Sequence, residues 1–306
     1  MDGILIIDKP AGITSHDVVA RCRRILQTKR IGHTGTLDPF ATGVIVMLVG
    51  KATRLAQFLD KDAKEYEATV RLGFETDTGD RTGELRITNY ELRDVSIEEI
   101  EDVLKDFRGE IMQTPPMFSA KKVEGKKLYE LARQGIEIER KPVSVKIYEL
   151  RMTNDELRQK TDDFGLWTLD FGLKVSCSAG TYIRTLAEDI GRKLEIGAHL
   201  AQLRRTKAGK FTIENAVTLE QLEKIVSEKS VETILISMNA AVSHLAEVRL
   251  STFEIGKIKN GVRVARNLPE TTDKSYLRLT DDDENLLAIG IYNEAEKTVQ
   301  PNIVLV

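Results

Sequence analysis

Residues 32–43 have the sequence GHTGTLDPFATG, a polar segment punctuated by glycine that contains a single acid, Asp38. Pro39 follows the acid directly, and an apolar run at 44–49 leaves the segment. The run predicts a buried strand, while glycine permits turns that residues with side chains resist. A carboxylate held in such a loop and fixed by proline is preorganised for nucleophilic or general-base chemistry. The alternative is an aspartate that only initiates a turn before proline.

Further motifs along the chain favour the chemical interpretation. They are GILIIDKP at 3–10, GITSHDVV at 12–19, KEYEA at 64–68, TDTGD at 76–80, SAKK at 119–122, GKKLYELAR at 125–133, CSAGTYIRTL at 177–186, HL at 199–200 and LRRT at 203–206. In this order, and with the loop around Asp38, they resemble the TruB family of tRNA pseudouridine synthases. Departures are mild: Ile45 stands where the family usually has leucine, and Ile196 where it has a small or polar residue.

The resemblance implies formation of pseudouridine, which breaks the N1–C1′ bond of uridine, turns the uracil and joins its C5 to C1′. This chemistry needs a carboxylate, a cation that keeps it ionised and an apolar pocket for the detached base. By matching motifs, the resemblance assigns Asp38 as the essential carboxylate, Tyr66 as the ring stacked on the uracil and Arg184 as the ion-pair partner of Asp38. It leaves open whether Asp38 attacks C1′, attacks C6 or abstracts a ribose proton. Without the resemblance, Tyr66 would be a core residue and Arg184 a surface cation.

The resemblance also implies that Tyr182 and Leu203 are further walls of the base pocket and that His33 positions RNA. A general-base role for His33 is the alternative, because histidine titrates near neutral pH. The other three histidines have no spacing typical of metal ligands, and Cys22 and Cys177 stand far apart in the chain. This pattern argues against zinc chemistry and against a disulfide framework. We therefore expect buried packing cysteines, no metal and no cofactor.

Charge supports RNA binding only locally. The chain has 48 acidic and 45 basic residues, a net charge of −3, whereas nucleic-acid-binding domains are usually basic. Basic residues nevertheless cluster at 21–30, at 204–210 and in an insertion at 114–142. The candidate phosphate contacts in the insertion are Lys121, Lys122, Lys126 and Lys127. We interpret the insertion as an arm that grips RNA and orders mainly when bound; an amphipathic helix packed on the domain is about equally supported.

Strand-like runs alternate with helical segments along residues 1–246. The predicted strands cover residues 3–7, 44–49, 66–74, 143–150, 166–176 and 200–206. The predicted helices cover residues 15–27, 96–107, 127–134, 182–194 and 219–226. Because no regular βαβ rhythm is present, we predict an α+β fold with a mixed, largely antiparallel sheet flanked by helices. The resemblance implies the pseudouridine synthase fold, with the RNA cleft across the sheet.

The pattern of predicted elements changes from about residue 247. A short helix is predicted at 251–259, and strands are predicted at 276–280, 286–292 and 299–306. The pattern alone indicates a small β-rich module, whereas the resemblance implies a PUA-like β-barrel that binds RNA. We therefore expect a catalytic domain at 1–246 and an RNA-binding domain at 247–306.

The function implied by the resemblance is isomerisation of uridine 55 in the T loop of tRNA, after the uridine is flipped from its stack. The expected partner is the T arm of tRNA, and we expect a monomer with no obligate protein partner. Two alternatives are a non-catalytic tRNA chaperone, which would not need Asp38, and a dyskerin-like synthase directed by a guide complex. A hydrolase with paired carboxylates is disfavoured, because no second acid shares the loop.

The sequence also bears on location in the cell. Apolar runs are short and charged residues make up 30% of the chain, so we expect no membrane segment. The N-terminus enters a strand-like run without a basic region before it, which argues against a signal peptide. We expect a cytoplasmic protein.

Overall fold

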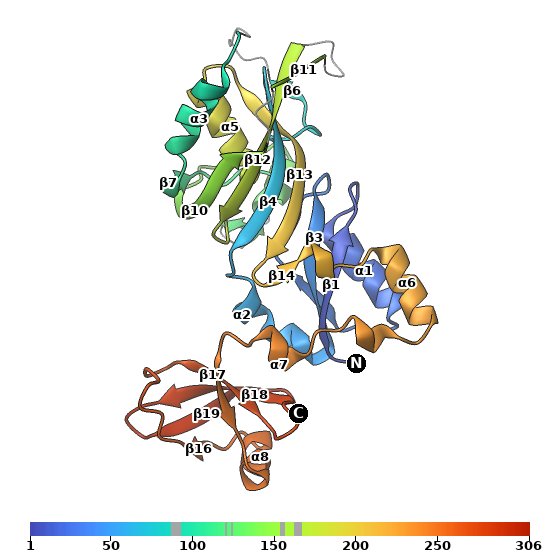
Figure 1. The fold of residues 1–306 in the computed structure, drawn as a ribbon, viewed down its shortest axis with the longest axis vertical. Coiled ribbons are helices and arrows are strands. Elements are labelled where there is room, and N and C mark those ends of the chain that lie inside the picture. Colours follow the sequence, from blue (N-terminus) through green and yellow to red (C-terminus); the bar gives the residue numbers. More distant parts are fainter. Residues whose placement is uncertain (87–92, 120, 124, 154–156, 162–166) are drawn as a thin grey trace.

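The computed structural model describes residues 1–86, 93–119, 121–123, 125–153, 157–161 and 167–306, with only the backbone of 122, 127, 159–161 and 167. Figure 1 shows an elongated molecule in which a long sheet with flanking helices stands above a small β-rich module that contains the C-terminus.

One mixed sheet runs through the larger part of the molecule, and within the described residues it has ten strands. Seven form a continuous path in the order β1 (Gly3–Lys9), β3 (Thr42–Val49), β13 (Ala198–Ala208), β4 (Lys64–Leu72), β12 (Trp167–Cys177), β10 (Val143–Met152) and β7 (Gly109–Gln113). The others are β2 (Ile31–Thr34) beside β3, β11 (Arg158–Thr161) beside β12 and β14 (Phe211–Thr212) beside β13. Every pairing is antiparallel except that of β13 with β3. The predicted α+β fold with a largely antiparallel sheet is confirmed.

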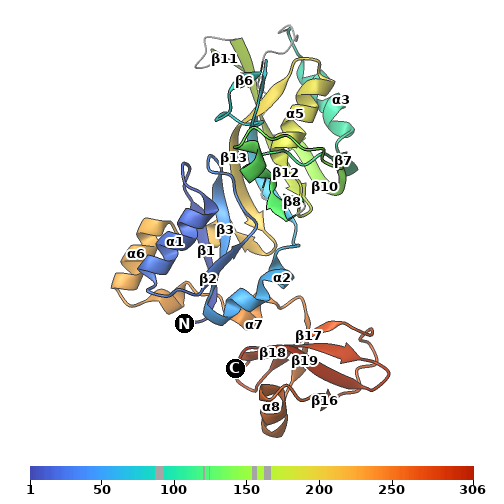
Figure 2. The same ribbon diagram turned by 180° about the vertical axis from the view of Figure 1, so that it is seen from behind.

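Helices cover the sheet in two separate places (Figures 1 and 2). They are α1 (Ser15–Ile25), α3 (Ile97–Lys105), α5 (Ile183–Lys193) and α6 (Leu219–Ser227). Leu104 of α3 and Leu186 of α5 share a hydrophobic cluster with Val70 of β4. At the other end of the sheet, Val18 of α1 belongs to a second cluster with Ile45 of β3. Both clusters follow from apolar residues that repeat with helical or strand period.

A five-stranded sheet forms the C-terminal module, in the order β15 (Ala246–Arg249), β17 (Tyr276–Thr280), β18 (Leu286–Asn293), β19 (Thr298–Val304) and β16 (Val264–Ala265), with helix α8 (Thr252–Lys259) packed beside it. The sheet is curled, as expected for a small barrel (Figure 1). Its Ile289 and Ile303 share one buried cluster with Ile4 and Ile6 of β1. The C-terminal module and the larger part of the molecule are therefore joined by a common core.

The insertion contains a short hairpin and a helix, β8 (Lys122–Val123), β9 (Lys126–Lys127) and α4 (Leu128–Ala132). Leu128 and Leu131 of α4 are buried. The helix therefore packs through these two apolar side chains, and the RNA-gripping role of the insertion stays a prediction. Two strands were not predicted from the sequence pattern. Strand β7 lies at the sheet edge and exposes Glu110 and Met112. Strand β2 occupies the start of the loop predicted at 32–43.

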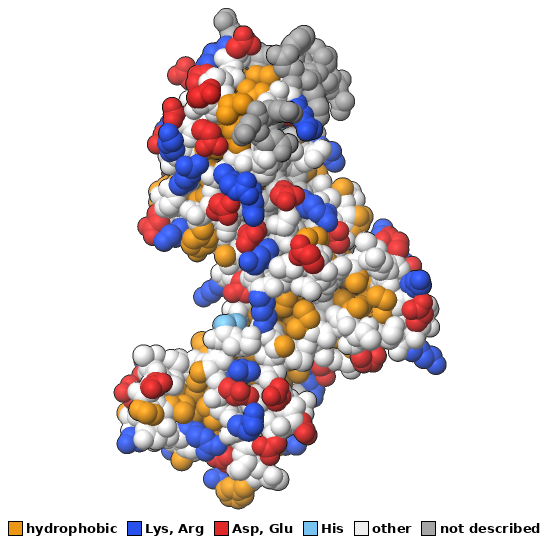
Figure 3. Space-filling view, in the orientation of Figure 1, with side chains coloured by type: hydrophobic (Ala, Val, Ile, Leu, Met, Phe, Trp, Pro, Cys, Tyr) orange, Lys and Arg blue, Asp and Glu red, His pale blue; other side chains and the backbone are white. Residues whose placement is uncertain are grey.

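The remaining elements are short. They are η1 (Gly50–Leu55), α2 (Ala56–Leu59), β5 (Glu75–Thr76), β6 (Leu85–Arg86), η2 (Ile213–Asn215), η3 (Val231–Thr233) and α7 (Met238–Ala241). In the described part of the chain, no helix is both long and apolar enough to cross a membrane. Figure 3 shows acidic and basic side chains interspersed over the face of β4, β12 and β13, where Arg71 and Asp170 form an ion pair at 2.8 Å.

Candidate active site

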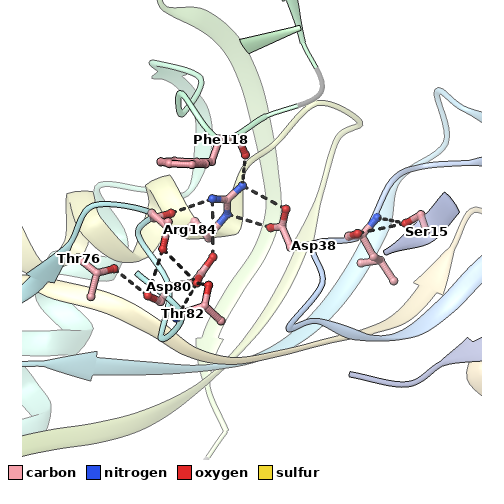
Figure 4. Close-up of polar contacts among 9 residues, drawn as sticks. Ser15, Asp38, Thr76, Asp80, Thr82, Phe118 and Arg184 are labelled. Atoms are coloured by element: carbon pink, nitrogen blue, oxygen red, sulfur yellow. Dashed lines mark hydrogen bonds and ion pairs between the residues drawn. The ribbon is translucent and has the colours of Figure 1, made fainter. Parts of the chain in front are cut away.

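Asp38 and Arg184 meet as a two-point ion pair beyond the edge of β3 (Figure 4). Arg184 Nε lies 2.9 Å from Asp38 Oδ2, and Arg184 Nη2 donates to Asp38 Oδ1 at 3.2 Å. The Arg184 side chain is 5% exposed, whereas that of Asp38 is 32% exposed. The guanidinium therefore fixes the carboxylate from the protein side and leaves part of it accessible to a ligand.

Two backbone carbonyls accept further hydrogen bonds from the Arg184 guanidinium (Figure 4). Nη1 donates to the carbonyl oxygen of Thr78 and Nη2 to that of Phe118, each at 2.7 Å. Asp80, which is 4% exposed, approaches Nη1 at 3.7 Å. Arg184 is thus oriented by the turn after β5 and by the insertion as well as by Asp38. Neither Asp80 nor the two carbonyls had been assigned a role from the sequence.

Three buried side chains hold the loop that carries Asp38. Ser15 Oγ accepts from the backbone N–H of Leu37 at 2.9 Å and donates to the Leu37 carbonyl at 3.1 Å. Lys9 Nζ donates to the carbonyls that flank Phe40, those of Pro39 at 3.2 Å and Ala41 at 2.7 Å. Because these bonds fix the backbone on both sides of Asp38, the carboxylate has little freedom to move.

Arg205 is the third of these side chains and is 1% exposed. It donates from Nη2 to the Gly35 carbonyl and from Nε to the Val44 carbonyl, both at 2.7 Å. Gly43 allows β13 to approach this closely, since a Cβ there would lie 2.1 Å from the Arg205 carbonyl oxygen and its φ is +100°. A side chain at position 43 would therefore displace the loop.

A cavity of about 240 Å³ opens beside the Asp38–Arg184 pair. Tyr66, Tyr182 and Leu203 line it together with Asp38 and Arg184. The other lining residues are Gly35, Thr36, Leu37, Asp60, Lys64, Ser119, Ser178, Ala179, Gly180, Thr181, Ile183 and Arg205. Apolar and polar side chains both line the cavity, so it can hold the ring of a base and offer hydrogen-bonding groups to the polar edge of that base.

Burial changes the acid–base properties of two residues at this site. It raises the pKa of the Asp38 carboxyl, and the charge of Arg184 opposes that rise. Burial also raises the pKa of the Tyr66 phenol, so this ring is neutral at physiological pH. A carboxyl group with a shifted pKa that lines a cavity is typical of a functional site.

Other candidates lie away from the cavity. His33 is half-buried, contacts the His16 ring edge-on at 5.8 Å between centroids and is not among the described residues that line the cavity. In the insertion, Lys121 is half-buried and Lys126 is exposed. The side chains of Lys122 and Lys127 lie outside the described part of the chain.

The family of the chain follows from comparison with family models. A model described as TruB family pseudouridylate synthase (N terminal domain) matches residues 23–183. A second, described as tRNA pseudouridylate synthase B C-terminal domain, matches residues 184–243. The chain belongs to the TruB family.

Similar proteins and structures agree with this membership. The tRNA pseudouridine synthase B of Geobacillus thermodenitrificans is 46% identical over 261 residues, 85% of each chain. That of Solibacter usitatus is 40% identical over 308 residues, 99% of this chain and 98% of its own. A chain in a crystal structure of a Cbf5-Nop10-Gar1 complex superimposes with a TM-score of 0.73 at 28% identity, over 99% of this chain and 85% of that chain. An H/ACA RNP bound to a substrate RNA containing 2'-deoxyuridine gives a TM-score of 0.71 at 26% identity, with coverage of 99% and 85%.

Membership in the TruB family makes this chain a pseudouridine synthase, an isomerase. The predicted family, enzyme class and fold are confirmed. The residues that sequence reasoning left without a role, Lys9, Ser15 and Asp80, all lie in motifs that carried the resemblance, whereas Arg205, counted in the basic cluster at 204–210, is buried and is therefore not a surface cation. Position in a family motif was therefore the signal that could have found them.

The raised pKa of Asp38 predicts an acid limb in the pH dependence of kcat/KM, which reports the free enzyme. If the reaction needs ionised Asp38, kcat/KM falls as pH falls through that pKa, above the range of an ordinary aspartate. Rates measured from neutral to acidic pH, with circular dichroism as a control for folding, test this. An acid limb at the position of free aspartate would contradict it.

Proposed function

We propose that this protein isomerises uridine 55 in the T loop of tRNA to pseudouridine, with Asp38 as the reacting carboxylate. The observation that carries the proposal is the two-point Arg184–Asp38 pair, which lines a cavity of about 240 Å³ together with Tyr66. The TruB family membership supplies the reaction, and relatives named tRNA pseudouridine synthase B support tRNA as the substrate.

The proposed roles follow the chemistry of an isomerisation. Asp38 reacts with the flipped nucleotide at C1′, at C6 or at a ribose proton, and Arg184 keeps it ionised and aimed. Tyr66 stacks on the uracil while the N1–C1′ bond breaks, the base turns and the C5–C1′ bond forms. The C5 proton is then lost and N1 gains one, so no cofactor or net redox change is required. Tyr182 and Leu203 confine the detached base.

Removing a uridine from its stack costs a few kcal/mol, which contacts to the RNA must offset. We propose that the insertion, the PUA-like module of residues 247–306 and His33 provide such contacts. Exposed Lys126 and half-buried Lys121 lie on the insertion, whose Phe118 carbonyl binds Arg184. The insertion therefore spans from surface cations to the candidate site.

The test is direct. The protein alone is incubated with unmodified tRNA transcript, and pseudouridine is mapped by carbodiimide adduct and primer extension. The expected product is one modified position, 55. A transcript with cytidine at that position is the control, and absence of product on the normal transcript would refute the proposal.

A guide-dependent synthase is the second candidate, because the solved structures reported above include Cbf5 with protein partners and an RNP with its substrate RNA. The same assay separates the two functions. Activity of the isolated chain without guide RNA or added protein supports the stand-alone enzyme. Activity that appears only with such additions supports the guide-dependent one.

If the insertion contacts phosphates, replacing its four lysines with alanine should flatten the salt dependence of tRNA binding. Each lost contact is expected to reduce the slope of log affinity against log salt by about 0.7 to 0.9. The lysines are Lys121, Lys122, Lys126 and Lys127. The matched control replaces four exposed lysines elsewhere, Lys105, Lys193, Lys224 and Lys229. Equal slopes in both variants would remove phosphate binding from the insertion.

A further inference from the structure

Gln113, the last residue of β7, is a fully buried polar side chain at 0% exposure. Its amide makes two hydrogen bonds to the backbone of a single residue, Tyr182. Oε1 accepts from the Tyr182 N–H at 3.0 Å, and Nε2 donates to the Tyr182 carbonyl at 3.3 Å. The two residues are 69 positions apart in the chain. A side-chain amide can satisfy both groups at once because it carries a donor and an acceptor side by side.

Tyr182 begins the helix that carries Arg184. It is the N-cap of α5, with φ −103° and ψ 109°, and its own side chain makes no capping hydrogen bond. Its carbonyl accepts the first bond of the helix, from Leu186 N at 3.1 Å. Since Gln113 holds both polar groups of this residue, it sets the orientation from which α5 starts, two residues before Arg184.

The same N-cap residue forms part of the cavity, which Tyr182 and Arg184 line together. Beyond Gln113 the chain enters the insertion, and there the Phe118 carbonyl accepts from Arg184 Nη2 at 2.7 Å. One continuous segment, 113–118, thus contacts both the N-cap residue of α5 and the guanidinium group of Arg184. Ser15 holds the backbone beside Asp38 in the same way, since its hydroxyl binds both the N–H and the carbonyl of Leu37.

We propose that Gln113 is a positioning residue of the active site. By holding the Tyr182 backbone, it places Arg184 so that the guanidinium makes both of its contacts with the Asp38 carboxylate. The proposal rests on the function proposed above. It differs from a purely structural role, in which Gln113 would only satisfy buried backbone groups and contribute to folding.

The principal variant is Gln113→Met, which keeps the length of the side chain and removes both hydrogen bonds. Gln113→Asn is the second variant, because it keeps the amide but shortens its reach by one methylene. The matched control is Val145→Ala, since Val145 is 5% exposed on β10 and pairs with Ile111 of β7. This control destabilises the same strand pair without touching Tyr182.

Single-turnover rates on tRNA, tRNA affinity and urea unfolding are measured for each protein under conditions where it is fully folded. We expect Gln113→Met to lower the rate by about tenfold or more, because misplacing a reacting group by ~1 Å costs about 100-fold. Gln113→Asn should show a smaller loss, tRNA affinity should change less than about twofold, and Val145→Ala should lose stability but retain its rate.

The pH dependence of the rate provides a second readout, because a loss of stability alone would not shift its acid limb. The charge of Arg184 lowers the pKa of Asp38, so a displaced Arg184 should shift the acid limb of the rate to higher pH in both Gln113 variants. Wild-type rates and an unshifted limb in folded Gln113→Met and Gln113→Asn would overturn the proposal. Inactivity of the wild type and of Val145→Ala would instead refute the proposed function.

Discussion

Asp38→Asn is expected to abolish pseudouridine formation while changing tRNA affinity by less than about tenfold, or roughly 1.4 kcal/mol. The carboxylate acts on one nucleotide, whereas affinity comes from many contacts to the RNA. The substitution should fold, because Arg184 keeps the carbonyls of Thr78 and Phe118 and the nearby Asp80. It also removes a carboxylate whose ionisation burial disfavours.

The control for this variant is Asp170→Asn. Asp170 forms a comparable two-point pair with Arg71, at 2.8 and 2.9 Å, on the sheet face away from the cavity. Loss of the charged Arg71–Asp170 pair should lower the free energy of unfolding and leave the reaction rate of the folded protein largely unchanged. Single-turnover product formation by Asp38→Asn near the wild-type rate would contradict the assignment of Asp38.

Arg184→Met is expected to have the second largest effect. Without the guanidinium, Asp38 and Asp80 face each other with no intervening cation, which raises the pKa of Asp38 further and reduces its ionised fraction. The rate should fall by about 100-fold or more, the scale expected for a misplaced reacting group. The free energy of unfolding should fall by about 3 kcal/mol, the lower end for a broken buried pair, because Asp38 is partly exposed.

A double-mutant cycle separates the two effects. Arg184→Met combined with Asp38→Asn should recover part of the lost stability and none of the activity, because the repulsion between carboxylates is removed along with the reacting group. Arg184→Lys keeps the charge but cannot form the two-point contact, so its rate should also fall. Near-wild-type activity of Arg184→Lys would show that charge alone suffices.

Much of the fold could be predicted from residue patterning, because buried strands and amphipathic helices repeat apolar residues with different periods. The strand predicted at 276–280 is β17 itself, and the helix predicted at 96–107 contains α3, which starts at a capping box of Ser96 and Glu99. Strand β7 was missed because it is five residues long, and exposed Glu110 and Met112 give it no clean apolar face.

The candidate site could be predicted only through the resemblance. Asp38 and Arg184 are 146 residues apart, and no local spacing indicates that they meet. The partners of the polar anchors could not be predicted for a different reason. Lys9 and Gln113 bind backbone carbonyls and N–H groups, which every residue has, so those partners leave no mark in the sequence, although the family motif at 3–10 marks Lys9 itself.

The shared core beneath the C-terminal sheet has a consequence for how this protein recognises its substrate. One buried cluster contains Ile4 and Ile6 of β1 together with Ile289, Ile303 and Leu305 of the module. We therefore expect the module and the catalytic body to unfold as one cooperative unit rather than independently. Truncating the module would open the interior of the catalytic body, so surface substitutions are the cleaner test of whether the module contacts RNA. Because these side chains pack across the junction, we expect the module to keep a nearly constant distance from the loop that carries Asp38, so that the shape of an RNA decides whether it can reach both.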